Sequence, residues 1–75
     1  MVNRKELLKS WTKHLLQDID ELKMWREDKD PRNEIMHYRY KSKTIRQYHT
    51  ELCIEEIEDD IENIKKLVDD IIKED

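Results

Sequence analysis

The segment at residues 54–71, which reads IEEIEDDIENIKKLVDDI, decides the fold of this chain. Its apolar residues recur at alternating steps of three and four, which is the spacing of one stripe along an α-helix. Acidic residues flank the stripe on both sides. Such a heptad seam predicts a helix that packs against another helix or against its own copy in a coiled coil. The seam consists of Ile54, Ile57, Ile61, Ile64, Val68 and Ile71.

A second amphipathic helix is predicted upstream, over about residues 4–28. Asn3 followed by Glu6 is a capping pair, in which each side chain bonds to a free amide at the start of the helix. The apolar face that follows covers about half of the helix circumference, so it requires more than one partner helix. This face contains Leu7, Leu8, Trp11, Leu15, Leu16, Ile19, Leu22 and Trp25.

Pro31 separates the two predicted helices. Proline disfavours helical geometry at the residue before it but fits the first position of a new helix, with Asp30 as its N-cap. No Gly and no further Pro follows, so the default prediction is one long helix over residues 31–73. The connection is short, which predicts antiparallel neighbours. The chain is therefore expected to be a single all-α domain, residues 1–75, built as a helical hairpin.

The apolar pattern of the long helix changes phase near residues 49–53, and two architectures explain the change. In the first, the helix is continuous and its Ile seam projects beyond the first helix to pair in a homodimer. In the second, the chain bends near residues 49–51, with Thr50 as an N-cap, and forms a three-helix bundle. No turn residue occurs near Thr50, which favours the continuous helix.

Length and composition support self-association. A domain of 75 residues buries only about 60% of the surface of its unfolded chain.

Cys53 is the only cysteine, and no apolar run reaches the roughly 18 residues of a membrane span. The N-terminal residues lack the apolar core of a signal peptide. A cytoplasmic protein, with a composition typical of a bacterial or phage genome rich in A and T, is expected.

Charge is distributed unevenly along the chain. Residues 1–28 carry no net charge, residues 29–50 carry +4 and residues 51–75 carry −8. In the basic part, cationic and aromatic residues alternate, a pattern suited to phosphate contacts and base stacking. Because the whole chain is acidic, a solvated basic face is favoured over this nucleic-acid interpretation. The residues of the alternative are Arg39, Tyr40, Lys41, Lys43 and Arg46.

The acidic part offers a candidate surface for a partner protein. Regularly spaced carboxylates on a helix would complement a basic groove, although most such surfaces are simply solvated. The candidate partner-binding residues are Glu55, Glu56, Asp59 and Asp60.

Asp18 is the polar residue inside the apolar face of the first helix, and His14 lies one turn before it. A buried carboxylate requires a partner, so we expect a salt bridge to a Lys or Arg of the second helix. A recognition or acid-base residue between two Trp side chains is the alternative.

Two residue pairs have the spacing of metal ligands. His49 and Cys53 share a helix face, and Glu34 and His37 match the Glu-x-x-His pair of di-iron bundles. Neither pair has further ligands at a diagnostic spacing, so no metal or other cofactor is predicted.

No catalytic motif occurs in the sequence, so an enzyme is not predicted. The predicted function is that of a small interaction protein, such as an inhibitor, adaptor or antirepressor, which binds a protein partner through its helical surface and forms a homodimer.

Overall fold

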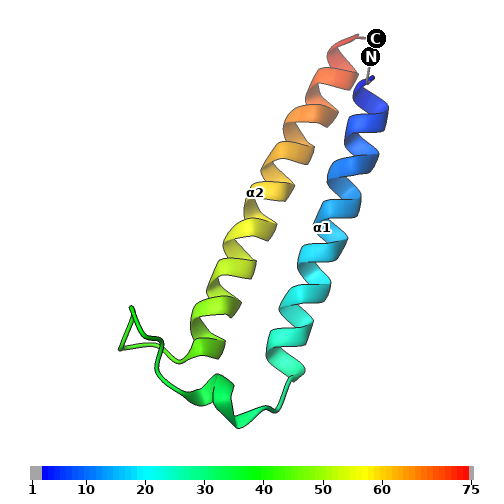
Figure 1. Ribbon diagram of the computed structural model, residues 1–75. Helices are drawn as coiled ribbons and strands as arrows, with labels where there is room; N and C mark the ends of the chain where they lie inside the picture. Colours follow the sequence, from blue (N-terminus) through cyan, green and yellow to red (C-terminus); the bar gives the residue numbers. More distant parts are fainter. Residues whose placement is uncertain (1–2, 75) are drawn as a thin grey trace.

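The computed structural model describes residues 3–74 and confirms the all-α helical hairpin (Figure 1). Helix α1 runs from Arg4 to Glu27, the short 3-10 helix η1 from Pro31 to Glu34, and α2 from Ile45 to Glu74. The two long helices lie side by side and antiparallel, and the hairpin is 52 Å long. An ion pair between Arg4 and Glu74 joins the ends of the two helices.

Helix α1 begins and ends where its sequence predicts. The side chain of Asn3 accepts a hydrogen bond from the amide of Glu6 at 2.8 Å, which confirms the predicted cap. The helix ends at Glu27, and the amide of Asp28 bonds to the carbonyl of Met24. The short polar segment before Pro31 therefore stops the helix as expected.

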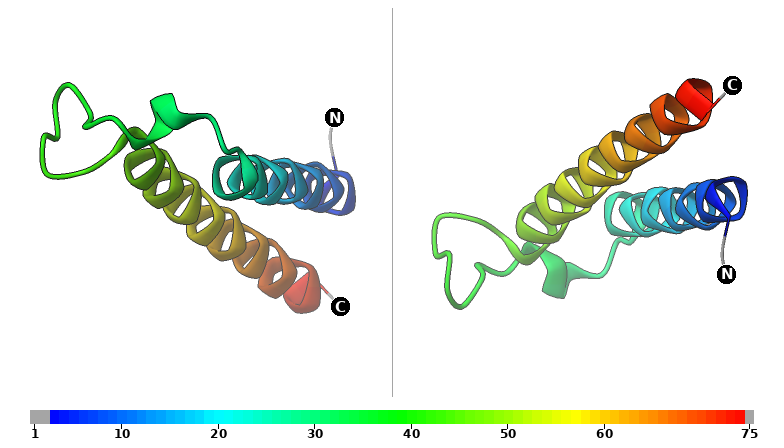
Figure 2. Two further views of the ribbon diagram at one scale, coloured as in Figure 1. Left: turned by 90° about the horizontal axis from the view of Figure 1, so that it is seen from below. Right: turned by 90° about the horizontal axis from the view of Figure 1, so that it is seen from above.

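The prediction that the long helix begins at residue 31 is wrong. Asp30 and Pro31 do take the N-cap and first positions, but of the four-residue helix η1, and the backbone is extended again at Ile35. Residues 35–44 then form an irregular loop, which extends away from α1 beyond the start of α2 (Figure 2). A single antiparallel bridge between Met36 and Thr44 closes this loop. The Tyr, Ser and Thr residues of this loop have weak helix propensity, so contacts within the loop determine its conformation instead.

The long helix α2 begins after a capping box. The hydroxyl of Thr44 accepts from the amide of Gln47 at 3.1 Å, and the Gln47 side chain accepts from the amide of Thr44 at 2.9 Å. This reciprocal pair satisfies two amides that would otherwise lack partners at the helix start. The Thr-x-x-Gln spacing was present in the sequence and could have located the boundary.

Helix α2 is continuous through residues 49–51, so the bent three-helix arrangement is not adopted. The apparent phase change came from combining two segments that differ in structure. Ile35 and Tyr38 belong to the loop and Ile45 and Leu52 to the helix, so the apolar residues before and after residue 45 do not lie on one helical face.

The two long helices pack through heptad seams that face each other. Every residue of both seams is buried or half-buried, with exposure lowest near the middle of the hairpin. Cys53 is the only buried apolar residue among residues 3–74. A pair of helices alone therefore encloses very little apolar surface. The α1 seam is Leu8, Trp11, Leu15, Asp18, Leu22 and Trp25, and the α2 seam is Cys53, Ile57, Asp60, Ile64, Leu67 and Ile71.

The predicted Ile seam is thus divided between two environments. Ile57, Ile64 and Ile71 belong to the seam that faces α1 and are half-buried, as is Val68 beside it. Ile54 and Ile61 remain 42% and 45% exposed. Among residues 3–74, no helix combines the length and apolar character needed to cross a membrane.

Candidate functional site

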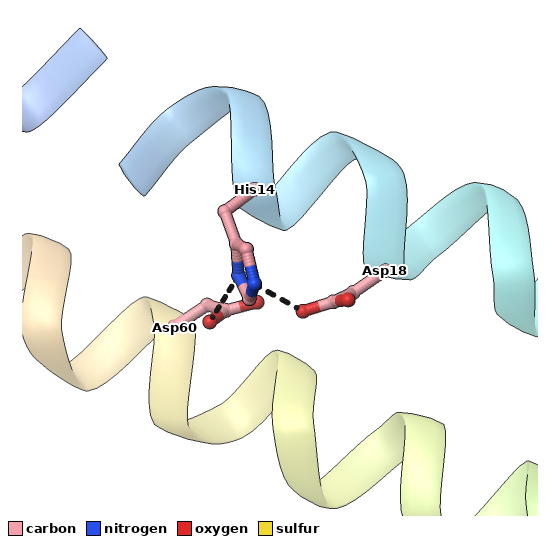
Figure 3. A group of neighbouring side chains, drawn as sticks. All are labelled: His14, Asp18 and Asp60. Atoms are coloured by element: carbon pink, nitrogen blue, oxygen red, sulfur yellow. Dashed lines mark hydrogen bonds and ion pairs between the residues drawn. The ribbon is translucent and has the colours of Figure 1, made fainter. Parts of the chain in front are cut away.

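Two carboxylates meet in the middle of the helix pair. Asp18 of α1 is 6% exposed and Asp60 of α2 is 3% exposed, and both occupy seam positions that usually hold apolar residues (Figure 3). The expected partner of Asp18 was a Lys or Arg of the second helix, and this prediction is wrong. The chain instead places a second carboxylate opposite the first.

His14 of α1 bridges the two carboxylates. Its Nδ1 atom lies 3.0 Å from Asp60 Oδ1 and 3.3 Å from Asp18 Oδ2 (Figure 3). The hydrogen bond to Asp60, followed by the charge of Asp18, raises the pKa of His14 above its ordinary 6.5. The imidazole side chain is 54% exposed, so the cluster is open to solvent at this point.

The environment also changes the ionisation of Asp18. A hydrogen bond shared with Asp60 and burial between the helices raise the pKa of Asp18 to about 6. The Oδ2 atom of Asp60 is buried without a hydrogen bond from residues 3–74, and the buried Oδ2 atom of Asp18 has only its 3.3 Å contact with His14 Nδ1. Buried polar atoms without partners destabilise a folded protein, so this cluster is incomplete as it stands.

Two more carboxylates adjoin Asp18 on the same side of the helix pair. Glu21 and Glu56 each bring an oxygen within 4.8 Å of Asp18 and of each other, and both are exposed. Five ionisable side chains therefore gather at one point, four of them acidic. We call His14, Asp18, Glu21, Glu56 and Asp60 the carboxylate cluster.

Cys53 is buried beside the cluster but does not belong to it. Burial, followed by the nearby negative charge of Glu21, raises the pKa of its thiol, so Cys53 stays protonated and unreactive at neutral pH. His49, the residue that shares its helix face in the sequence, stacks its ring on Trp25 with centroids 4.3 Å apart.

Glu34 and His37, the second pair with the spacing of metal ligands, have structural roles in the folded chain. Glu34 accepts from the Arg46 guanidinium at 2.6 Å. His37 is buried, and its Nδ1 accepts the amides of Arg39 and Tyr40 at 3.1 and 3.3 Å. Glu34 and His37 therefore stabilise the connecting segment.

The predicted nucleic-acid residues are divided between loop and helix. Arg46 donates to the carbonyl oxygens of Trp25 and Asp28, and Lys43 forms an ion pair with Glu51. Tyr40 stacks on Tyr48, with centroids 5.1 Å apart. The other two cationic residues, Arg39 and Lys41, lie on the exposed loop. Much of the basic segment therefore stabilises the base of the hairpin.

The structure places three of the four residues of the predicted acidic surface at the surface of the hairpin. Glu55, Glu56 and Asp59 are exposed, whereas Asp60 lies inside the helix pair and is not available as a surface residue. The reason is helical phase: Asp60 follows Cys53 by seven residues and so shares the inward seam. A heptad that starts at Cys53 instead of Ile54 includes Asp60 in the inward seam.

The opposite face of the hairpin is apolar. One hundred degrees per residue places Ile54, Ile61 and Ile72 on the edge of α2 away from Glu56, and Leu16 on the edge of α1 away from His14. These four side chains are 42%, 45%, 64% and 57% exposed, respectively. We call them, together with the half-buried Ile19 and Val68 beside them, the apolar face.

Comparisons of this chain with protein-family models, curated proteins and solved structures found no match.

Proposed function

We propose that this protein acts without catalysis, as an interaction protein whose working form is a two-fold dimer of hairpins. The observation that supports this proposal most directly is the apolar face. Four large apolar side chains on one side of the two-helix unit are 42–64% exposed, and apolar side chains that gather on one face mark an interaction surface. Covering it with the same face of a second copy produces a four-helix bundle, the usual solution for helices of this length.

The small core of the single hairpin supports the same conclusion. Cys53 is the only buried apolar residue among residues 3–74, so the hairpin alone gains little from the hydrophobic effect. Each chain of a dimer would place Leu16, Ile54 and Ile61 in a shared interior. Stability and association are then one property of the chain, as in many obligate dimers.

Charge at the borders of the apolar face favours a second copy as the occupant. On α1, Lys9 and Lys23 lie seven residues on either side of Leu16, and Asp20 interrupts this basic edge. On α2, the border next to Ile61 is acidic, interrupted by Lys65. A two-fold axis parallel to the helices places α1 of one copy on α2 of the other, so opposite charges meet. The basic border consists of Lys5, Lys9 and Lys23, and the acidic border of Glu58, Glu62 and Asp69.

The test is the solution mass of purified protein over a range of concentrations. Wild type is expected to be a dimer, and Leu16→Glu with Ile61→Glu is expected to be a monomer. Met24→Glu is the matched control, because Met24 is 52% exposed but lies outside the apolar face. A monomeric wild type, or a double variant that stays dimeric, would contradict the proposal.

Charge reversal provides a second, more specific test. Lys5→Glu, Lys9→Glu and Lys23→Glu together should weaken the dimer, because like charges would then face each other. Adding Glu58→Lys, Glu62→Lys and Asp69→Lys to the same chain should restore it. Rescue is the outcome that only pairing of these two borders explains, and its failure would rule out this arrangement of the dimer.

The dimer leaves the acidic residues of α2 free for a partner protein, which we propose carries a basic surface. Glu55 and Asp59 are exposed, and residues 51–75 carry a net charge of −8. Replacing both with Lys should abolish binding of a basic partner while leaving the dimer intact. Binding that persists unchanged in this variant would exclude the acidic surface.

A further inference from the structure

We propose that His14, Asp18 and Asp60 bind a divalent first-row transition-metal ion, such as Mn²⁺ or Zn²⁺, between the two helices. The site lies on the side of the hairpin away from the apolar face. It is therefore independent of dimer formation, and either proposal can fail alone.

The first argument is the burial of unpartnered oxygen atoms. Asp18 and Asp60 are each more than nine-tenths buried. Asp60 Oδ2 has no hydrogen bond from residues 3–74, and Asp18 Oδ2 has only its 3.3 Å ion-pair contact with His14. Two facing carboxylates in an apolar seam repel each other, and apolar residues at these positions would stabilise the pair of helices more. A cation bound to both carboxylates removes this repulsion and compensates the cost of burying them.

The second argument is distance. Three ligand atoms about 2.1 Å from one metal ion lie roughly 3.0–3.4 Å from each other in octahedral or tetrahedral geometry. His14 Nδ1 lies 3.0 Å from Asp60 Oδ1 and 3.3 Å from Asp18 Oδ2. Two of the three donor separations therefore already match those of metal ligands, and the donor atoms of all three residues lie within 4.8 Å of one another (Figure 3).

The third argument is the chemistry of the donors. One imidazole nitrogen with carboxylate oxygens suits Mn²⁺, Fe²⁺ or Zn²⁺, whereas Mg²⁺ and Ca²⁺ prefer oxygen alone. Glu21 and Glu56 place further negative charge beside Asp18, which strengthens attraction of a cation.

The site also has an entrance. The His14 side chain is 54% exposed and lines a surface hollow with Leu7, Ser10 and Trp11. An ion in this hollow therefore meets the imidazole, the one proposed ligand that is open to solvent.

The experiment is thermal unfolding of the full chain after removal of metal with a chelator. Adding Mn²⁺ or Zn²⁺ should raise the unfolding midpoint of wild type, because the ion binds only the folded site, whereas Mg²⁺ should leave it nearly unchanged. Titration calorimetry on the same protein gives the affinity. Asp60→Asn and His14→Gln should each weaken binding of Mn²⁺ or Zn²⁺ by at least about 100-fold, more than loss of a group outside the first coordination shell.

Asp59→Asn is the matched control, because it removes the same charge from the neighbouring, exposed position. It should bind the ion as wild type does. Equal loss in Asp59→Asn and Asp60→Asn, or no response of wild type to either ion, would overturn the proposal. Cys53→Ala separates this site from a thiolate site: binding of Zn²⁺ should persist, and its disappearance would also overturn the proposal.

Discussion

Asp18 of α1 and Asp60 of α2 occupy facing seam positions of the helix pair, and both are enclosed by it. Because the ionised carboxylates repel each other without a bound metal, Asp60→Asn should stabilise the metal-free protein by about 1 kcal/mol or more at neutral pH. Chemical denaturation of chelator-treated protein measures this. Asp59→Asn should stay within about 0.5 kcal/mol of wild type, as exposed substitutions usually do. A destabilised Asp60→Asn variant would show that the charged pair supports the fold.

The pH dependence of the metal-free protein follows from the same cluster. The pKa of Asp18 is raised to about 6, by the hydrogen bond with Asp60 and by burial, so the folded chain holds this proton more tightly than the unfolded chain. Its contribution is fully present below the ordinary 3.8 and is lost as the pH rises through about 6. The raised pKa of His14 acts in the same direction at higher pH.

The groups that face Asp18 are His14 and Glu21 on its own helix and Glu56 and Asp60 on α2. Thermal unfolding in the presence of chelator should therefore give a higher midpoint at about pH 5 than at about pH 7.5. Asp18→Asn should reduce this difference. Asp30, whose pKa Arg32 lowers to about 2, loses its contribution only below this range. A midpoint that rises with pH across this interval would contradict the assignment.

Arg46 links the start of α2 to the end of α1. Its guanidinium donates to the carbonyl oxygens of Trp25 and Asp28 and forms an ion pair with Glu34, and the side chain is only 20% exposed. Arg46→Ala should destabilise the chain by about 2 kcal/mol, because charged hydrogen bonds are lost and carbonyl groups lose their partner. Arg39→Ala, on the exposed loop, is the control and should change stability little. Equal effects of the two variants would show that Arg46 has no special structural role.

The capping box at Thr44 predicts a separate local effect. Thr44→Ala removes the hydroxyl that accepts the amide of Gln47 and should cost about 1 kcal/mol of stability. Ser42→Ala removes a hydroxyl from the neighbouring loop and should be nearly neutral. Urea denaturation of the three proteins measures the difference. If both variants matched wild type, the start of α2 would depend on other contacts.

Local signals in the sequence located most of the hairpin but not its long loop. The cap at Asn3 and the stop before Pro31 predicted α1 nearly to the residue, because both act within one turn of the chain. The Pro31 signal is equally local and marks a helix start, but it does not determine how far the helix continues. Residues 35–44 leave the helix because the bridge between Met36 and Thr44 and the burial of His37 are contacts formed in the folded chain.

The sequence by itself determined that this protein is a pair of antiparallel amphipathic helices, since apolar spacing and caps are properties of neighbouring residues. Tertiary structure alone decided which stripe of α2 faces α1. The apolar arc of α2 is wider than one partner helix can cover, so either the stripe through Ile54 and Ile61 or the one through Cys53 and Asp60 could turn inward. The folded chain encloses the second, and so places Asp60 against Asp18 and His14, residues whose proximity depends on how the two helices pack.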